Sequence, residues 1–166
     1  MTVEHMLADL AVQRATTSAT TPDDEQFRLW AELAVAREAV EQGKHGYTLA
    51  IRIVDEEEGR RFNQEYRGKD YATNVLSFPR DLPEGLPSEI KQSQLGDLLI
   101  CAPVVAREAL EQGKPEIDHW GHLTIHGILH LLGYDHEQGA DAVVMEALET
   151  DILAKLDIPD PWQVGI

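Results

Sequence analysis

Three of the chain's seven histidines lie within one short segment, HGILHLLGYDH, which runs from His126 to His136. On a helix, His126 and His130 stand one turn apart on the same face, so both imidazoles can point at one ion. Gly133 can end this helix in a left-handed conformation, and the returning chain can then bring His136 to the same point. Three neutral imidazoles with one open position form the usual catalytic zinc site. The spacing therefore predicts one metal ion at a helix end and the turn that follows it.

The histidines upstream leave a second pairing open. His122 lies four residues before His126, so these two side chains also share a helix face. This pair lacks a well-placed third ligand after a glycine break, and we therefore expect His119 and His122 to support the ligands or line a cleft. Imidazole ligands favour zinc and also accept nickel or copper. The prediction is one Zn²⁺ per chain, with Ni²⁺ or another divalent transition metal as the alternative.

The segment also matches the zinc-protease pattern H-E-x-x-H-x-x-G-x-x-H, except at its second position. In those proteases the glutamate is the general base that takes a proton from the metal-bound water. This chain has Gly127 there, which has no side chain. A peptidase is therefore disfavoured, and a catalytic partner for the metal must come from another segment.

The elements that must hold these histidines follow from apolar periodicity and from helix start and stop signals. Helices are predicted at 22–42, 56–66, 102–112, 115–132 and 140–156. Runs rich in β-branched and aromatic residues predict strands at 47–54, 74–78 and 96–101, and weak alternation indicates another at 2–8. This order predicts an α+β fold, with a single domain over 1–166 and a small mixed sheet of about four strands covered by helices. A flexible connector is expected at 15–21 and a loose tail at 159–166.

The charge distribution bears on the partners of the protein. A formal net charge of −16 disfavours a generic nucleic-acid binder, which neutralises phosphates with clustered Lys and Arg. Six of the fourteen basic residues nevertheless lie between 52 and 80, so a local basic strip can coexist with an acidic whole. The chain has neither a signal-peptide pattern nor an apolar run of the roughly 20 residues that cross a bilayer. With a single cysteine as well, we expect a cytoplasmic protein without a membrane partner.

The sequence resembles the YbeY family of bacterial ribosomal RNA maturation factors, which are metal-dependent endoribonucleases. The resemblance rests on collinear segments that cover about the last 120 residues, and the N-terminal helix fits without a diagnostic motif. The segments are HGILHLLGYDH (126–136), YRGKDYATNVLSFP (66–79), LGDLLIC (95–101), EQGKP (111–115) and MEALE (145–149).

The resemblance implies a site and an activity. It makes His126, His130 and His136 the ligands of a zinc-like ion and assigns catalytic roles to Arg67 and His126. It implies a mostly parallel sheet with the metal at the end of a cleft. The implied activity is cleavage of single-stranded RNA in 3′-end maturation of small-subunit rRNA and in ribosome quality control, with the small ribosomal subunit and its assembly proteins as partners.

The residue types agree with such chemistry. A divalent ion can polarise a phosphoryl oxygen or supply a hydroxide, and the planar fork of Arg67 matches a phosphate. We expect Lys69, Asn74 and Ser77 to contribute more weakly to substrate binding. Arg67 has an alternative partner in the carboxylate of Asp70, which would make it a loop-fixing residue.

Several alternatives stay open from the residues alone. Asp97 or Asp135 can accept a hydrogen bond from a ligand imidazole, or Asp97 from the arginine. Either a metal-bound water or the 2′-hydroxyl of the substrate can attack phosphorus. Two other functions compete with the nuclease: a non-catalytic ribosome-assembly factor with a structural metal, and a zinc hydrolase of another class.

Overall fold

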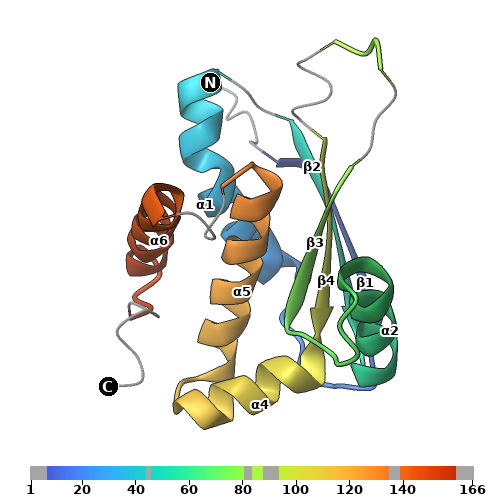
Figure 1. Ribbon diagram of the computed structural model, residues 1–166. Coiled ribbons are helices and arrows are strands. Elements are labelled where there is room, and N and C mark those ends of the chain that lie inside the picture. Colours follow the sequence, from blue (N-terminus) through green and yellow to red (C-terminus); the bar gives the residue numbers. More distant parts are fainter. Residues whose placement is uncertain (1–6, 44–45, 81–83, 88–93, 135–138, 160–166) are drawn as a thin grey trace.

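The computed structural model describes residues 7–43, 46–80, 84–87, 94–134 and 139–159 (Figure 1). Within this part of the chain the strands are β1 (Leu7–Ala15), β2 (Tyr47–Val54), β3 (Val75–Pro79) and β4 (Gln94–Cys101). The helices are α1 (Asp24–Gln42), α2 (Glu56–Arg67), α4 (Ala102–Gln112), α5 (Glu116–Leu131) and α6 (Gly139–Ala154). The predicted ligand His136 and its neighbour Asp135 lie outside the described residues, as does the predicted tail from 160 onward.

The four strands form one sheet in the order β1-β2-β4-β3. Strand β2 pairs in parallel with β1 and with β4, and β3 runs antiparallel to β4 at the edge. The prediction of a small, mixed and mostly parallel sheet in an α+β domain is confirmed. None of the described helices is both long and apolar enough to cross a membrane.

The helices form layers on both faces of the sheet (Figure 1). Helices α1 and α5 cover one face, and α6 packs on the side of α5 that is away from the sheet. Helix α2 lies on the opposite face, against β4. Because α5 is enclosed by the sheet on one side and by helices on the other, most of its residues are buried. The helix that carries the histidines is therefore the central element of the fold.

The N-terminal strand differs most from the sequence-based expectation. Residues 2–6 of the strand expected at 2–8 lie outside the described residues. Within the described part, β1 runs from Leu7 to Ala15, well past the predicted end, and takes in the first residue of the predicted connector. The next two residues are also held, because Thr16 and Thr17 donate hydrogen bonds to the carboxylate of Asp55. Asp55 occupies the N-cap position of α2 but makes no side-chain capping bond there. Its carboxylate joins the end of β1 to the end of β2 instead.

Candidate metal centre and substrate cleft

Helix α5 ends in the way that its glycine predicts. Gly133 has a φ of +102°, and its N–H donates to the carbonyl of His130 at 3.0 Å. The N–H of Tyr134 donates to the carbonyl of Leu129, also at 3.0 Å, which completes a Schellman motif. The turn also contacts one of the predicted ligands, because Nδ1 of His130 donates a hydrogen bond to the carbonyl oxygen of Tyr134 at 3.0 Å. This bond keeps the proton on Nδ1 and leaves Nε2 of His130 able to bind a metal.

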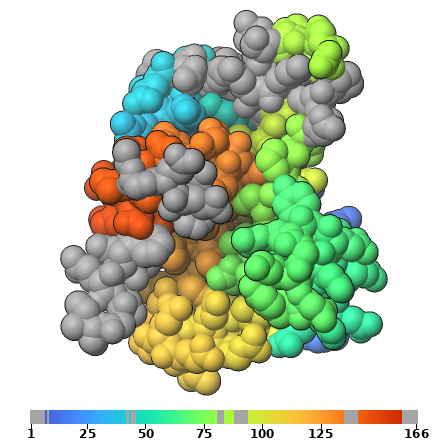
Figure 2. Space-filling model, in the orientation of Figure 1, coloured from blue at the N-terminus to red at the C-terminus, as the bar shows by residue number. Residues whose placement is uncertain are grey.

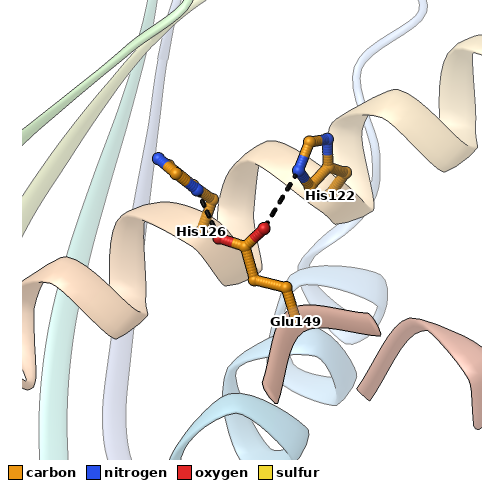
Figure 3. A group of neighbouring side chains, drawn as sticks. All are labelled: His122, His126 and Glu149. Carbon is orange, nitrogen blue, oxygen red and sulfur yellow. Dashed lines mark hydrogen bonds and ion pairs between the residues drawn. The ribbon is translucent and has the colours of Figure 1, made fainter. Parts of the chain in front are cut away.

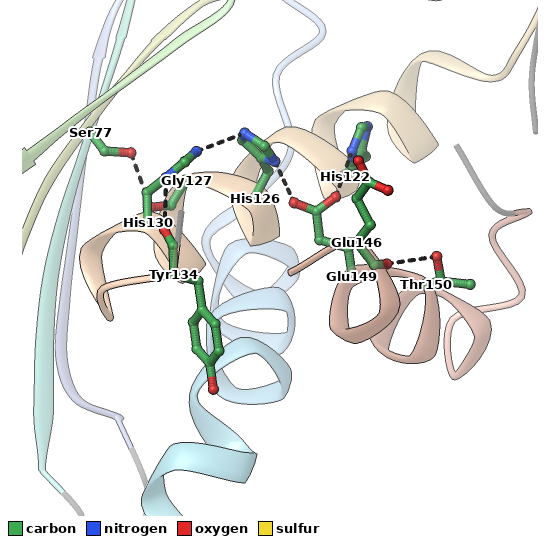
Figure 4. A network of polar contacts seen from close by, with 9 residues as sticks. All are labelled: Ser77, His122, His126, Gly127, His130, Tyr134, Glu146, Glu149 and Thr150. Atoms are coloured by element: carbon green, nitrogen blue, oxygen red, sulfur yellow. Dashed lines mark hydrogen bonds and ion pairs between the residues drawn. The ribbon is translucent and has the colours of Figure 1, made fainter. Parts of the chain in front are cut away.

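The imidazoles of His126 and His130 converge. Their Nε2 atoms lie 3.0 Å apart, and the ring centroids are separated by 4.6 Å (Figure 4). Two neutral imidazoles that present their Nε2 atoms to one point are a suitable donor pair for zinc or a similar ion. His126 and His130 could therefore bind one ion together, and His136 stays the predicted third ligand.

A carboxylate from α6 completes the surroundings of His126. Glu149 is fully buried, and its Oε1 accepts a short hydrogen bond from Nδ1 of His126 (Figure 3). Its Oε2 lies 3.4 Å from Nε2 of His122. Burial alone would raise the pKa of Glu149, but the hydrogen bonds from His122 and His126 lower that pKa to about 2. Glu149 is therefore an anion buried between two histidines.

Sequence reasoning missed Glu149 as a site residue. Its signal is an acidic residue on the apolar face of α6, four positions after Met145 and three before Ile152, both of which are buried. A carboxylate at such a position requires a partner, because an unpaired buried charge is costly. The sequence therefore indicates that Glu149 has a polar partner, but it does not show which residue that partner is.

Glu149 also creates a second candidate set of ligands. His122, His126 and Glu149 each offer an atom within 4.8 Å of the others, and these three residues could form a metal site. The pair of His122 and His126, for which the sequence offered no well-placed third ligand after a glycine break, therefore has a candidate third ligand in Glu149. The two sets share His126 but need different ring nitrogens: Nε2 for the site with His130, and Nδ1 for the site with Glu149.

Gly127, where zinc proteases carry their glutamate, faces the sheet. A Cβ atom at this position would lie 2.7 Å from Cδ2 of Leu98 in β4 and 3.3 Å from the side chains of Val75 and Ser77 in β3. The hydroxyl of Ser77 donates to the carbonyl of Gly127 at 3.0 Å (Figure 4). Absence of a side chain thus lets α5 approach the strands closely. A glutamate here would meet the core.

Gly127→Ala should lower the free energy of unfolding by about 1–3 kcal/mol through overpacking, despite the higher helix propensity of alanine. Urea unfolding of the two proteins measures the difference. Gly59→Ala in α2 is the control, since its Cβ would meet the Sγ of Cys101 at a milder 3.3 Å. Equal effects at the two positions would contradict close packing at Gly127.

A cleft of about 600 Å³ runs beside these histidines. It is lined from α2, from the segment that leads into and along β3, and from α5. In Figure 2 the green surface of α2 and the following segment lies next to the orange surface of α5. The lining residues are Tyr66, Arg67, Thr73, Asn74, Val75, Leu76, Ser77, Pro79, His122, Leu123, His126 and His130. In a chain of net charge −16, this described lining contains an arginine and three histidines and no carboxylate. The cleft is suited to an anionic ligand.

Arg67 reaches this cleft from the last turn of α2. The helix ends at Gly68, which has a φ of +71°, and the loop that follows is held by the buried Asn63, whose side chain donates to the carbonyl of Tyr71 at 2.7 Å. Asp70 accepts two hydrogen bonds from Arg60, at 2.7 and 3.0 Å. The alternative in which Asp70 engages Arg67 is therefore wrong. Among the described residues, the guanidinium of Arg67 has no hydrogen-bond or ion-pair partner and lines the cleft.

Of the three residues expected to contribute more weakly to substrate binding, two line the cleft and one does not. Asn74 and Ser77 line the cleft, although Ser77 already donates to Gly127 and Asn74 donates to Glu108 at 2.9 Å. Lys69 is exposed and does not line the cleft. The expectation for Asp97 is wrong, because its carboxylate lies 3.7 Å from Arg80 and faces a separate pocket.

Next to Asn74, a partly buried chain of polar contacts joins Glu108 of α4 to His119 of α5. Oε1 of Glu108 lies 2.9 Å from Nε2 of His119, which is 2% exposed, and it also accepts the bond from Asn74. Burial alone would raise the pKa of Glu108, but the bonds from His119 and Asn74 lower that pKa below its ordinary value of 4.5. His119 thus supports the wall of the cleft from inside.

Glu108→Gln should weaken the pH dependence of stability. A carboxyl whose pKa is lower in the folded state stabilises the fold above its unfolded pKa, and this contribution is lost as the pH falls through the folded pKa. The difference in unfolding free energy between the two proteins should be largest near pH 7 and should narrow below about pH 4.5. Urea unfolding across pH measures it, with the exposed Glu111→Gln on the same helix as control. A difference that is constant with pH would contradict the role given to Glu108.

Comparison with known proteins places this geometry in a family. A family model described as Endoribonuclease YbeY matches residues 12–157. The chain belongs to the YbeY endoribonuclease family. The endoribonuclease YbeY of Halorhodospira halophila (strain DSM 244 / SL1) is 55% identical over 155 residues, which cover 93% of this chain and 96% of that protein. The endoribonuclease YbeY of Xanthomonas axonopodis pv. citri (strain 306) is 54% identical over 162 residues, with 98% of both chains covered.

A solved structure shares the fold. The solution structure of TM1509 from Thermotoga maritima matches with a TM-score of 0.54 at 22% identity and covers 89% of this chain and 91% of that one. Three of the segments that resemble the YbeY family meet at the site: 66–79 supplies one wall of the cleft, 126–134 two of its three histidines, and 145–149 the buried Glu149. The resemblance seen in separate segments is thus reflected in one place on the molecule.

Proposed function

We propose that this chain is a metal-dependent endoribonuclease that cleaves single-stranded RNA during ribosomal RNA processing. The observation that carries the proposal is the cleft in which Arg67 and three imidazoles line the wall without a carboxylate. RNA presents a phosphodiester at every step of its backbone, so an arginine beside a candidate metal site, in a described lining without a carboxylate, matches both the charge and the reacting group. The curated relatives at 54–55% identity carry the name endoribonuclease YbeY.

His126 and His130 hold the metal through their Nε2 atoms in this proposal, and His136 is the third ligand. The ion, Zn²⁺ or another divalent transition metal, supplies Lewis-acid activation of a phosphoryl oxygen or of a water. Glu149 accepts from Nδ1 of His126 and so keeps Nε2 unprotonated and directed at the ion. The carbonyl of Tyr134 does the same for His130.

Arg67 binds the scissile phosphate in the same cleft. Its planar guanidinium donates two parallel hydrogen bonds to phosphate oxygens and stabilises the negative charge that develops on them. No described protein carboxylate competes for this guanidinium, because Asp70 is held by Arg60. Asn74 and Ser77 keep the cleft wall in shape through their bonds to Glu108 and Gly127.

The acidic remainder of the chain is compatible with an RNA substrate that is brought to the enzyme by other contacts, and not bound through general electrostatic attraction. Arg67 in the cleft and the exposed Lys69 supply a local attraction, and an acidic whole suppresses binding to nucleic acid in general. We therefore infer that the enzyme acts in the cytoplasm on small-subunit rRNA, in 3′-end maturation and in ribosome quality control, with assembly proteins as further partners.

Cleavage of a single-stranded RNA by the purified protein tests the proposal. We expect chelation to abolish cleavage, added Zn²⁺ or Ni²⁺ to restore it, and a fully paired duplex to resist it. Activity should follow the protein through successive purification steps. Metal-loaded protein that cleaves no RNA would overturn the proposal and favour a ribosome-assembly factor. The ends of the products then identify the nucleophile, because a 2′,3′-cyclic phosphate implicates the ribose hydroxyl.

A further inference from the structure

We propose that Tyr66 forms a stacking site for an unpaired nucleobase of the RNA strand that enters the cleft. This inference rests on the proposed function and deepens it, because it gives a structural reason for a preference for single strands. Tyr66 would bind the base, whereas Arg67 and the metal-binding histidines act on the phosphate.

Tyr66 is an aromatic residue that the fold does not bury. The core aromatics Phe27, Trp30, Tyr47 and Trp120 are at most 1% exposed, whereas Tyr66 is 55% exposed. It nevertheless lines the cleft, immediately before Arg67 in the chain. An exposed ring at a cleft that contains an arginine is suited to bind a flat, apolar group next to an anion.

The ring of Tyr66 packs against another aromatic ring of the protein. Its centroid lies 4.5 Å from that of Phe78 in β3, with the planes inclined at 59°. Phe78 in turn packs edge-on against Phe62 of α2, with centroids 6.2 Å apart. Tyr66 therefore has little freedom to lose when a base binds, and its remaining surface stays open. A preorganised platform of this kind lowers the entropic cost of binding.

The position next to Arg67 fits the repeat of a nucleic-acid strand. Each nucleotide carries its base and its phosphate on one sugar, so an aromatic ring and a guanidinium that line the same cleft can engage different groups of one strand. A base inside a duplex already has its two faces covered by neighbouring bases, and only an unpaired base can stack on a protein ring. The site should accept all four bases, because each has a π-face.

Binding of short RNA oligonucleotides tests the inference. The ligands carry 2′-O-methyl groups that block attack by the ribose, and the protein is used without metal so that binding alone is read. We expect Tyr66→Leu to weaken binding about 10-fold and Tyr66→Phe, which keeps the ring, to bind within about 2-fold of wild type. Tyr71→Leu is the matched control, since Tyr71 is 58% exposed but lies outside this cleft. It should bind as wild type does.

An abasic substitution at successive positions of the oligonucleotide gives an independent readout on unaltered protein. One position should weaken binding to wild type about 10-fold and have no effect on Tyr66→Leu, since both changes remove the same stack. Equal binding by wild type and Tyr66→Leu, or an equal loss in Tyr71→Leu, would overturn the stacking site and leave the nuclease proposal intact. Wild-type protein that neither binds nor cleaves RNA would overturn both.

Discussion

Arg67→Ala should lower kcat/KM for cleavage of single-stranded RNA by about 10²–10³-fold while the metal content stays that of wild type. The reason is that the guanidinium, which lines the cleft without a described protein partner, is the group placed to stabilise charge on the phosphate. Arg67→Lys should recover only part of the loss, because an ammonium keeps the charge but not the planar fork. Rates at saturating and limiting RNA, with metal analysis of each variant, provide the measurement.

Arg61→Ala is the matched control for this prediction. Arg61 lies on the same helix and carries the same charge, but its guanidinium sits over the ring of Phe62, 5.8 Å from the centroid, and does not line the cleft. Its replacement should leave kcat/KM nearly unchanged. A comparable loss in both variants would mean that α2 contributes only general positive charge, and native activity in Arg67→Ala would remove Arg67 from the mechanism.

His130→Ala should weaken metal affinity more than 100-fold and abolish RNA cleavage, since it removes a direct ligand whose Nε2 lies 3.0 Å from that of His126. Glu149→Gln should weaken affinity by about 10–100-fold, the usual range when the partner of a ligand imidazole is altered. Competition with a chromophoric chelator measures each affinity without reference to activity. The absorption spectrum of the Co²⁺-loaded protein then reports whether the ligand set itself has changed.

The same variants distinguish the two possible sets of ligands. If His122, His126 and Glu149 bind the ion, His122→Ala should lose the metal and His130→Ala should keep it. If His126 and His130 bind it, His122→Ala should retain most of the affinity, and Glu149→Gln should leave the Co²⁺ spectrum unchanged. Metal retained in His130→Ala would therefore contradict the site proposed above.

The regular elements of the fold were largely predictable because their signals are local. Strand β2 alternates buried and partly exposed residues over 47–54, and helices α4 and α5 end within a residue or two of their predicted bounds. The extension of β1 to Ala15 was missed because LADLAVQRA has little β-branched or aromatic character. Its conformation comes from parallel pairing with β2, which no local pattern in β1 encodes.

The same distinction between local signals and long-range contacts applies to the candidate site. Spacing alone determined that His126 and His130 share a helix face and that Gly133 ends the helix, because both follow from backbone hydrogen bonds between residues three to five apart. Contacts between distant segments were not predictable in this way. Pairing of Glu149 with His126, 23 residues away, depends on how α6 packs against α5.

The sequence by itself therefore singled out His126, His130 and Arg67 as candidates, whereas the tertiary structure decided which neighbours each of them has and added Glu149. Gly127 was recognisable as a missing protease base, but only the approach of α5 to Leu98 shows that its lack of a side chain serves packing. Arg67 and Arg60 are both close to Asp70 in the chain, and only the folded loop shows that Arg60 takes the carboxylate and leaves Arg67 to the cleft. Secondary structure follows from local backbone preferences, whereas the hydrogen-bond partner of a side chain depends on how distant segments pack together.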